Sequence, residues 1–467
     1  MDNQDLNRLH QATLDILKRY GVRVESPKAL PLFKNAGIRT DDSAMRVYPA
    51  EQDIERALGT VPKTFNIYRQ DSDIPLTIGN DQHYILSGGG SVRVRTLDGQ
   101  YEQATWDHLR QFNRLLDALP NIHILLNQVD PQGDQPTNYY KLIAAEMFLG
   151  TRKPCCLQAN GEQDIQAMVE MASIIAGGKS ELKKRPIFLT GSNSEPPLCI
   201  PKHATEIHIA ASRSYIPTGL GDYAMMGVTS PITLAGTLAQ RNAVQMVSLI
   251  LSQLAQPGAP FYYTATSGST DMRTLNPIMA DPRVIKILKS SAELGKYYNL
   301  PIMGIATTDS KSPDAQAAVE RAICLQVSMD AGVHIIQGPT SMMDQMMLSC
   351  FVQTIIDHDI IGYLLAAHNK PIIDEENLAL DVIGDIIRKS DYGAMKFAIH
   401  DHTSKHMRDE TWQPMCFDYR SFTEWQAAGS PHLIERAKSV AHRILNTHVP
   451  NQLEEAIQKE IMRIATE

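Results

Sequence analysis

The stretch PIMGIATTDSKSPDAQAAVERAICLQVSMDAGVHIIQG, residues 301–338, contains two short apolar runs separated by one amphipathic segment. The runs are IMGIAT (302–307) and VHIIQG (333–338), and the segment 312–331 between them has apolar residues at helical spacing. Both runs are too apolar for strands with one face in water, so they predict parallel strands covered by helices on both faces. The stretch is therefore typical of a β-α-β unit.

The same alternation extends over the middle of the chain. The β-rich runs lie at 84–89, 122–128, 154–160, 186–192, 216–221, 261–266, 302–307 and 333–338. The helix candidates lie at about 104–118, 137–149, 162–177, 203–214, 233–255, 282–299, 312–331 and 342–366. Eight strands, each followed by a helix, predict an α/β protein of the (β/α)8 TIM barrel type.

A doubly wound open sheet is the alternative architecture, and it normally carries a glycine-rich phosphate loop between a strand and a helix. The glycine cluster SGGGSV (87–92) resembles such a loop but leads into VRVRTLDGQYEQA. That segment predicts a β-hairpin at 91–103 with Asp98 and Gly99 at its turn, so we reject a dinucleotide site there.

The two ends of the chain have a different pattern from the middle. Residues 1–80 contain three short helical patterns and predict an N-terminal helical cap. The barrel is expected over residues 81–369, and residues 370–467 predict a C-terminal helical appendage.

The composition is that of an ordinary enzyme of 467 residues, with 44 Lys and Arg against 52 Asp and Glu. This mild acidity gives no reason to expect a nucleic acid or an anionic membrane as a partner. Six cysteines without C-x-x-C spacing suit reduced thiols, and no run has the length of a membrane span. We therefore expect a cytoplasmic protein.

In a barrel of this type the active site lies where the strands end, because the loops converge there. The predicted strand exits are polar, but their only charged residues are Asp130, Asp222, Asp309 and Lys311. Metal-dependent barrels need more carboxylates and histidines at these positions. A glycosidase would need two facing carboxylates, and the sequence selects no pair.

The stretch FAIHDHTSKHMRDE, residues 397–410, is the richest in histidine. On a helix His402 and His406 would share a face, as zinc ligands do in H-E-x-x-H, but the general-base glutamate and a third ligand are missing. Capping and hydrogen bonding within the appendage are the competing interpretation, which we favour.

The chain resembles the trimethylamine methyltransferase (MttB) family over essentially its whole length. The resemblance rests on LHQATLDILKRYGVRVESPKALPLFKNAG near the start, then on YYTATSGSTDMRT, TTDSKSPDAQAAVERA and AGVHIIQGPTSMMDQMM, and on HTSKHMRDETWQP near the end. It implies a TIM barrel that transfers a methyl group to a corrinoid carried by a separate protein. Gln337 stands where the resemblance leads us to expect a histidine.

Members of the family without pyrrolysine are similar to enzymes that act on quaternary amines, and this sequence contains only the ordinary twenty residue types. The resemblance therefore implies transfer from glycine betaine, giving dimethylglycine, or from proline betaine, carnitine or butyrobetaine. The acceptor would be cob(I)alamin on a cognate corrinoid protein, with no metal in this chain, and we expect a homo-oligomer. A metal-dependent hydrolase using His402 and His406 and a non-catalytic betaine-binding protein are the alternatives.

A methylated cation is usually held by aromatic faces, and a betaine carboxylate needs a cation or hydrogen-bond donors. The aromatic candidates are Tyr223 and Trp412, followed by Tyr101, Phe351, Tyr139 and Tyr140. The carboxylate candidates are Arg93, Arg95, Arg273, Lys311 and His402. Asn193, Asp309 and Gln337 are expected to line the same site from the ends of their strands.

Overall fold

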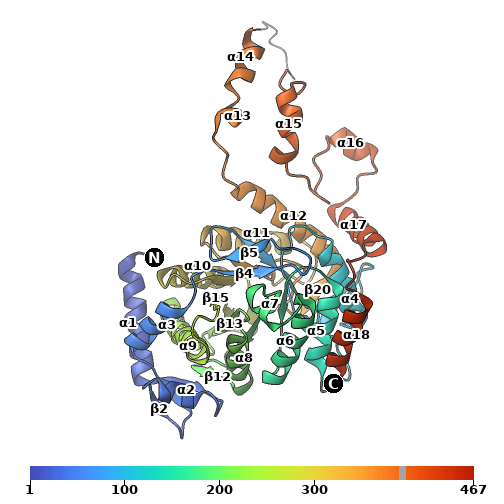
Figure 1. The fold of residues 1–467 in the computed structure, drawn as a ribbon. Helices are drawn as coiled ribbons and strands as arrows, with labels where there is room; N and C mark the ends of the chain where they lie inside the picture. The colour runs from blue at the N-terminus through green and yellow to red at the C-terminus, as the bar shows by residue number, and fades with distance from the viewer. Residues whose placement is uncertain (389–395) are drawn as a thin grey trace.

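The computed structural model describes residues 1–388 and 396–467 and has a strand at each of the eight apolar runs (Figure 1). These strands are β6 (Tyr84–Leu86), β9 (Leu125–Leu126), β10 (Cys155–Leu157), β11 (Phe188–Asn193), β13 (Thr218–Gly221), β15 (Tyr263–Ala265), β18 (Ile302–Ile305) and β19 (Ile335–Gln337). The eight predicted strands are confirmed. A short apolar run that lies between two amphipathic helical segments is much more typical of a buried strand than of a helix.

The eight strands form two four-stranded sheets in which every neighbouring pair is parallel. One sheet has the order β9-β10-β11-β13 and the other has the order β15-β18-β19-β6. Single parallel bridges join Leu86 to Ile124 and Thr218 to Phe261, so each sheet is linked to the other at both of its edges. The predicted α/β class is confirmed.

Helices follow the parallel strands and cover them from outside (Figure 1). They are α4 (Trp106–Asp117), α5 (Tyr139–Gly150), α6 (Glu162–Ala176), α7 (Lys179–Lys184), α8 (Lys202–Arg213), α9 (Leu234–Ala255), α10 (Pro282–Tyr297), α11 (Ala315–Asp330) and α12 (Phe351–His368). Asp314 caps α11 by accepting a hydrogen bond from the Ala317 N–H at 3.0 Å. Among the described helices, none has the length and apolar character needed to cross a membrane.

The helix predicted at 342–366 begins too early. The chain forms a loop and then strand β20 (Leu348–Cys350) before α12 starts at Phe351. Within the loop four non-glycine residues have positive φ, which is incompatible with a helix: Ser341, Asp344, Gln345 and Met346. The methionine-rich loop sequence has a high intrinsic helix propensity, and this propensity led to the prediction of a helix. Contacts with other segments of the chain determine the conformation that the loop adopts.

The predicted hairpin at 91–103 is confirmed. Strands β7 (Arg93–Arg95) and β8 (Tyr101–Gln103) pair antiparallel, and β20 adds to β7 in parallel. A second small sheet lies beyond β13 and β15, and its strands are β14 (Met225–Met226), β16 (Gly268–Thr270) and β17 (Pro277–Ile278).

The N-terminal segment is only partly helical. The predicted helices are present as α1 (Asn3–Arg19), α2 (Leu30–Asn35) and α3 (Glu51–Thr60). The same segment also contains β1 (Val22–Val24), β2 (Arg39–Asp41), β3 (Arg46–Tyr48), β4 (Phe65–Tyr68) and β5 (Pro75–Ile78), and β1 pairs with β12 (Cys199–Ile200). The expectation of a helical cap over residues 1–80 is therefore corrected, because strands this short show no detectable alternation.

The β4–β5 hairpin covers the amino-terminal ends of the parallel strands. The Tyr68 N–H donates to the Pro186 carbonyl at 2.9 Å, just before β11, and the Gln70 N–H donates to the Arg152 carbonyl, just before β10. Phe65 and Ile67 belong to the same apolar cluster as side chains from the parallel strands. The carboxyl ends of the strands therefore form the opposite end of the body.

The described residues after 370 form helices. These helices are α13 (Glu375–Leu378), α14 (Leu380–Arg388), α15 (Asp401–Glu410), α16 (Phe422–Ala427), α17 (Leu433–Thr447) and α18 (Glu455–Thr466). Helix α17 packs against α12 and α4, and α18 packs against α5 and α6. In contrast, α13, α14 and α15 project away from the body (Figure 1).

Candidate active site

A cavity of about 430 Å³ lies at the carboxyl ends of the parallel strands. Its wall includes Gln158 just after β10, Asn193 at the end of β11, Gly221 at the end of β13 and Gln337 at the end of β19. Polar strand ends therefore meet at the end of the body opposite the β4–β5 hairpin, which is where a parallel α/β fold places its ligands.

Three tyrosines line this cavity: Tyr140, Tyr223 and Tyr262. Burial raises the pKa of Tyr223 to about 12, so its phenol stays neutral at physiological pH. The Tyr262 hydroxyl donates to the Thr190 carbonyl at 2.7 Å, which leaves its ring as the part that a ligand can meet. A β-carbon at Gly219 would lie 2.2 Å from the Tyr262 ring, so only glycine leaves room for this ring.

Asp130 contributes a carboxylate to the cavity wall. Burial raises its pKa to about 6, although a hydrogen bond from Asn127 Nδ2 at 2.7 Å opposes the shift. This carboxylate is ionised at neutral pH and forms no ion pair among the described residues, so a bound cation would stabilise it.

Gly90 brings the backbone close to this carboxylate. Its φ of +76° lies in the left-handed region, and a β-carbon there would lie 3.3 Å from Asp130 Oδ2. A larger residue would combine backbone strain with crowding of the carboxylate. The glycine cluster at 87–92 thus shapes the cavity wall beside Asp130.

The cavity has little positive charge of its own. Among the described residues that line it, none is lysine or arginine, and His203 near the start of α8 is the basic side chain. The hydroxyls of Ser192 and Thr266 also lie in the wall, and neither has a hydrogen-bond partner among the described residues. These groups can donate hydrogen bonds to an anionic part of a ligand.

The loop before β20 forms the remaining wall through four side chains: Met342, Gln345, Met346 and Met347. Ser91 Oγ donates to the Met346 carbonyl at 2.9 Å, and the Asp344 N–H donates to the Ser310 carbonyl at 3.0 Å. The left-handed residues of this loop cost energy, so surrounding contacts must maintain them.

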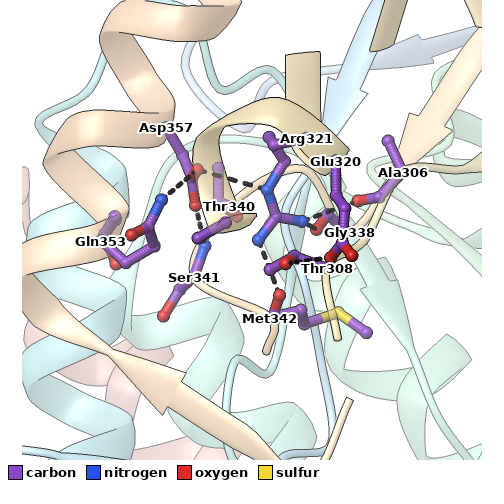
Figure 2. A network of polar contacts seen from close by, with 12 residues as sticks. Ala306, Thr308, Glu320, Arg321, Gly338, Thr340, Ser341, Met342, Gln353 and Asp357 are labelled. Atoms are coloured by element: carbon purple, nitrogen blue, oxygen red, sulfur yellow. Dashed lines mark hydrogen bonds and ion pairs between the residues drawn. The ribbon is translucent and has the colours of Figure 1, made fainter. Parts of the chain in front are cut away.

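The base of the loop is held by a buried arginine, which Figure 2 shows at the centre of a polar network. Arg321 Nη1 donates to the Ala306 and Gly338 carbonyls at 2.8 and 2.6 Å, and Nη2 donates to the Met342 carbonyl at 2.6 Å. Its Nε lies 3.2 Å from Asp357 Oδ1, and both side chains are fully buried. Arg321 therefore ties the exits of β18 and β19 to the loop.

Asp357 extends the same network to the loop backbone. Its Oδ2 accepts a hydrogen bond from the Ser341 N–H at 2.7 Å, and its Oδ1 accepts one from Gln353 Nε2 at 2.8 Å (Figure 2). A buried ion pair whose remaining acceptors are satisfied can stay charged in a protein interior. This pair positions the loop without contacting the cavity.

The structure brings four of the predicted site residues together. Tyr140, Tyr223, Asn193 and Gln337 all line the cavity. Asp309 lies elsewhere, because its carboxylate accepts hydrogen bonds from the N–H groups of Met279 and Ala280 and stabilises that turn.

Other predicted residues are structural or exposed. Phe351 is buried and stacks on Phe112, with ring centroids 4.1 Å apart, so it belongs to the core. Tyr101 is exposed on the hairpin and donates to the Lys311 carbonyl. Arg93 and Lys311 both lie near Asp344, at 3.7 and 3.6 Å, outside the cavity.

Trp412 and His402 belong to the C-terminal appendage rather than to the cavity. Trp412 packs edge-on against Tyr363 of α12. The ring centroids of His402 and His406 on α15 lie 4.4 Å apart, and His406 Nε2 is 3.2 Å from Glu376 Oε1. The two histidines therefore share a helix face, as predicted, but they do not share a site with the cavity.

Sequence reasoning missed His203 and Tyr262 as lining residues. Tyr262 lies in a predicted strand, and alternation along that strand could have indicated that its side chain points inside. No pattern in the sequence near His203 indicated that it lines the cavity. The tertiary structure brings the start of α8 to the cavity.

Residues 1–465 match the family described as Trimethylamine methyltransferase (MTTB). The trimethylamine methyltransferase MttB of Desulfitobacterium hafniense is 30% identical over 468 residues, covering 100% of this chain and 93% of that protein. The glycine betaine methyltransferase of Desulfitobacterium hafniense is 27% identical over 467 residues, covering 99% and 95%.

Solved structures share the architecture. A crystal structure of the hydroxylamine complex of MtmB is similar with a TM-score of 0.52 and 11% sequence identity, covering 98% of this chain and 87% of that chain. At this identity the similarity concerns the fold alone.

Proposed function

Because this chain belongs to the trimethylamine methyltransferase family, we propose that it moves a methyl group from a quaternary amine to Co(I) of a corrinoid on a separate protein. In this reaction the cobalt attacks a methyl carbon and the carbon–nitrogen bond breaks. The electron pair of that bond stays on nitrogen, so the amine leaves neutral and needs no proton. Positioning the methyl group is then the main task of the cavity.

The observation that carries this proposal is the lining of the cavity. Three tyrosines and the carboxylate of Asp130 surround a space of about 430 Å³, and none of the described lining residues is lysine or arginine. Aromatic faces and a carboxylate attract a methylated cation, and each ring contributes about 0.5–2 kcal/mol depending on desolvation. A compact quaternary ammonium suits this environment.

We propose glycine betaine as the substrate, which would give dimethylglycine as the product. The similarity to a glycine betaine methyltransferase supports this choice. His203, Ser192 and Thr266 are among the lining groups that can donate hydrogen bonds to its carboxylate, in place of Arg93, Lys311 and His402, which lie outside the cavity. Proline betaine, carnitine and butyrobetaine carry the same two charges and belong in the same test.

We also infer that the eight parallel strands close into a (β/α)8 barrel. The two bridges between the four-stranded sheets support closure, since they pair the edge strands in chain order. A closed barrel has no free strand edges, which explains why such short strands can be stable.

The test measures methyl transfer from each of a panel of quaternary amines to free cob(I)alamin. The absorbance change on formation of methylcobalamin reports the reaction. We expect glycine betaine to support the reaction and to give dimethylglycine. Binding of a betaine without transfer to free cob(I)alamin or to any corrinoid protein would favour the non-catalytic alternative. Stoichiometric zinc and loss of activity with chelators would favour the hydrolase that uses His402 and His406.

Replacing Tyr223 by alanine is expected to raise KM for the amine about 2- to 30-fold, the range of one aromatic contact with a cation. Steady-state kinetics with glycine betaine measure the change. Trp412→Ala is the matched control and should leave KM unchanged, because Trp412 packs on α12. Equal effects of the two substitutions would contradict the assignment of Tyr223 to the cavity.

Replacing His203 by alanine is expected to raise KM for glycine betaine about 10- to 100-fold, which corresponds to a hydrogen bond to a charged group. Tetramethylammonium lacks the carboxylate, so its KM should change little in the same variant. A similar increase for both compounds would show that His203 does not recognise the carboxylate.

A further inference from the structure

Strands β13 (Thr218–Gly221) and β15 (Tyr263–Ala265) are neighbours in space, but they do not form a continuous ladder. Among the described residues, their backbone pairing is limited to the bridge between Thr218 and Phe261. Beyond this bridge, residues from both strands line the cavity: Gly219, Gly221 and Thr264. The backbone groups with which the two strands face each other there are buried, so they need other hydrogen-bond partners.

Two side chains of helix α9 supply these partners. Arg241 Nη2 donates to the Thr264 carbonyl at 3.0 Å, and its Nε donates to the Asp222 carbonyl at 3.2 Å. One turn later, Gln245 Nε2 donates to the Leu220 carbonyl at 2.6 Å, and its Oε1 accepts a hydrogen bond from the Thr264 N–H at 3.2 Å. Helix α9 therefore replaces the missing ladder between the carboxyl ends of β13 and β15.

Arg241 is fully buried and is held by neutral acceptors. Its Nη1 donates to Ser291 Oγ of α10 at 2.6 Å, and among the described residues no carboxylate lies within ion-pair distance of its guanidinium. Arg321, the other fully buried arginine among the largest buried side chains, is paired with Asp357. A guanidinium presents five N–H donors in a rigid fork, so Arg241 can hold β13, β15 and α10 at fixed positions.

The backbone that Arg241 holds is the backbone that carries Tyr223. The carbonyl of Asp222 belongs to the peptide that joins it to Tyr223, whose ring lines the cavity. Ser194, which follows β11, holds the same segment from the other side: its N–H donates to the Gly221 carbonyl at 2.8 Å, and its Oγ donates to Asp222 Oδ1 at 2.7 Å. The position of the Tyr223 ring therefore depends on contacts from β11 and from α9.

We propose that Arg241 is a positioning residue for the substrate, which acts by fixing the orientation in which the Tyr223 ring meets the methylated nitrogen. Arg241 does not line the cavity, so its effect on the substrate must pass through the residues that it holds. A cation–π contact requires the cation over the ring face within about 6 Å of the centroid, so a ring that changes its orientation loses attraction. The inference rests on the proposed function, because it assigns the Tyr223 ring to a bound cation.

The first test is a double-mutant cycle between Arg241→Met and Tyr223→Ala, measured as KM for glycine betaine. Arg241→Met alone is expected to raise KM about 2- to 30-fold, the range for loss of one aromatic contact with a cation. In the Tyr223→Ala background, the same substitution should raise KM by less than about 2-fold, because two changes that remove one contact are not additive. An increase of equal size in both backgrounds would overturn the proposal.

Gln245→Met is the matched control, because it removes a buried bridge between the same two strands without removing a contact to the peptide before Tyr223. Its effect on KM should have the same size with and without the Tyr223 ring. Arg241→Lys keeps a buried charge but loses the fork, and it takes the place of Arg241→Met in the cycle if circular dichroism shows that the methionine variant is unfolded.

A second measurement reports the ring without turnover. In protein labelled with 3-fluorotyrosine, the 19F resonance of Tyr223 is assigned by its absence from Tyr223→Phe. We expect one sharp line in the wild type and in Gln245→Met, and a shifted or broadened line in the Arg241 variants. An unchanged line in those variants would reject the positioning role, whatever their KM. If the wild type uses no quaternary amine, the proposed function fails, and this line still decides whether Arg241 positions the ring.

Discussion

Replacing Arg321 by methionine is expected to lower the free energy of unfolding by about 3–5 kcal/mol, the range for breaking a buried ion pair. The substitution leaves the Asp357 carboxylate buried without its cation. It also removes the donors from the carbonyls of Ala306, Gly338 and Met342. Urea denaturation followed by circular dichroism measures the change, provided that the slope with denaturant stays the same.

Two further variants distinguish the effect of breaking the buried ion pair from the effect of removing any arginine. Arg463→Met removes an exposed arginine that pairs with Glu460 and Glu467 on α18, and it should change stability by less than about 1 kcal/mol. Arg321→Met combined with Asp357→Leu removes the uncompensated charge, so it should recover part of the loss. A single Arg321→Met variant as stable as Arg463→Met would contradict the importance of the network.

Replacing Asp130 by asparagine is expected to lower kcat/KM for a quaternary amine about 30- to 100-fold, because a charged partner in a buried site contributes about 2–3 kcal/mol. The same change should raise the free energy of unfolding at pH 7 by on the order of 2 kcal/mol, since burial raises the pKa of Asp130 to about 6. Asparagine resembles the neutral acid and can still accept from Asn127. Lower activity together with higher stability distinguishes a binding residue from a structural one.

The pH dependence follows from the direction of this shift. The folded-state pKa of Asp130 is higher than that of an ordinary aspartate, so its contribution to stability is present at low pH and is lost as the pH rises through about 6. Binding of a cation needs the ionised form, so kcat/KM should fall as the pH drops below about 6. The acidic limb of the profile should disappear in Asp130→Asn.

Asp98→Asn is a suitable control because its side chain is 83% exposed on the hairpin. It should leave both kcat/KM and the acidic limb unchanged. An Asp130→Asn variant with wild-type kinetics would remove the carboxylate from the binding site, whatever its effect on stability.

The sequence by itself determined the type and order of the main elements. Apolar runs such as 302–307 predicted their strands, and the amphipathic segment 312–331 predicted α11, because periodicity acts within a few residues of the chain. It also indicated that Tyr223, Asn193 and Gln337 lie at strand ends, where the cavity is.

Only the tertiary structure decided which polar residues meet and which surfaces remain uncovered. His203 reaches the cavity through the placement of α8, and residues 342–347 form a wall instead of a helix because Arg321 and Asp357 hold the base of their loop. Trp412 and Phe351 are aromatic residues of the same general type as Tyr223, yet they pack on other elements. Burial, and with it the pKa of Asp130, depends on contacts between segments far apart in sequence, which local patterns do not specify.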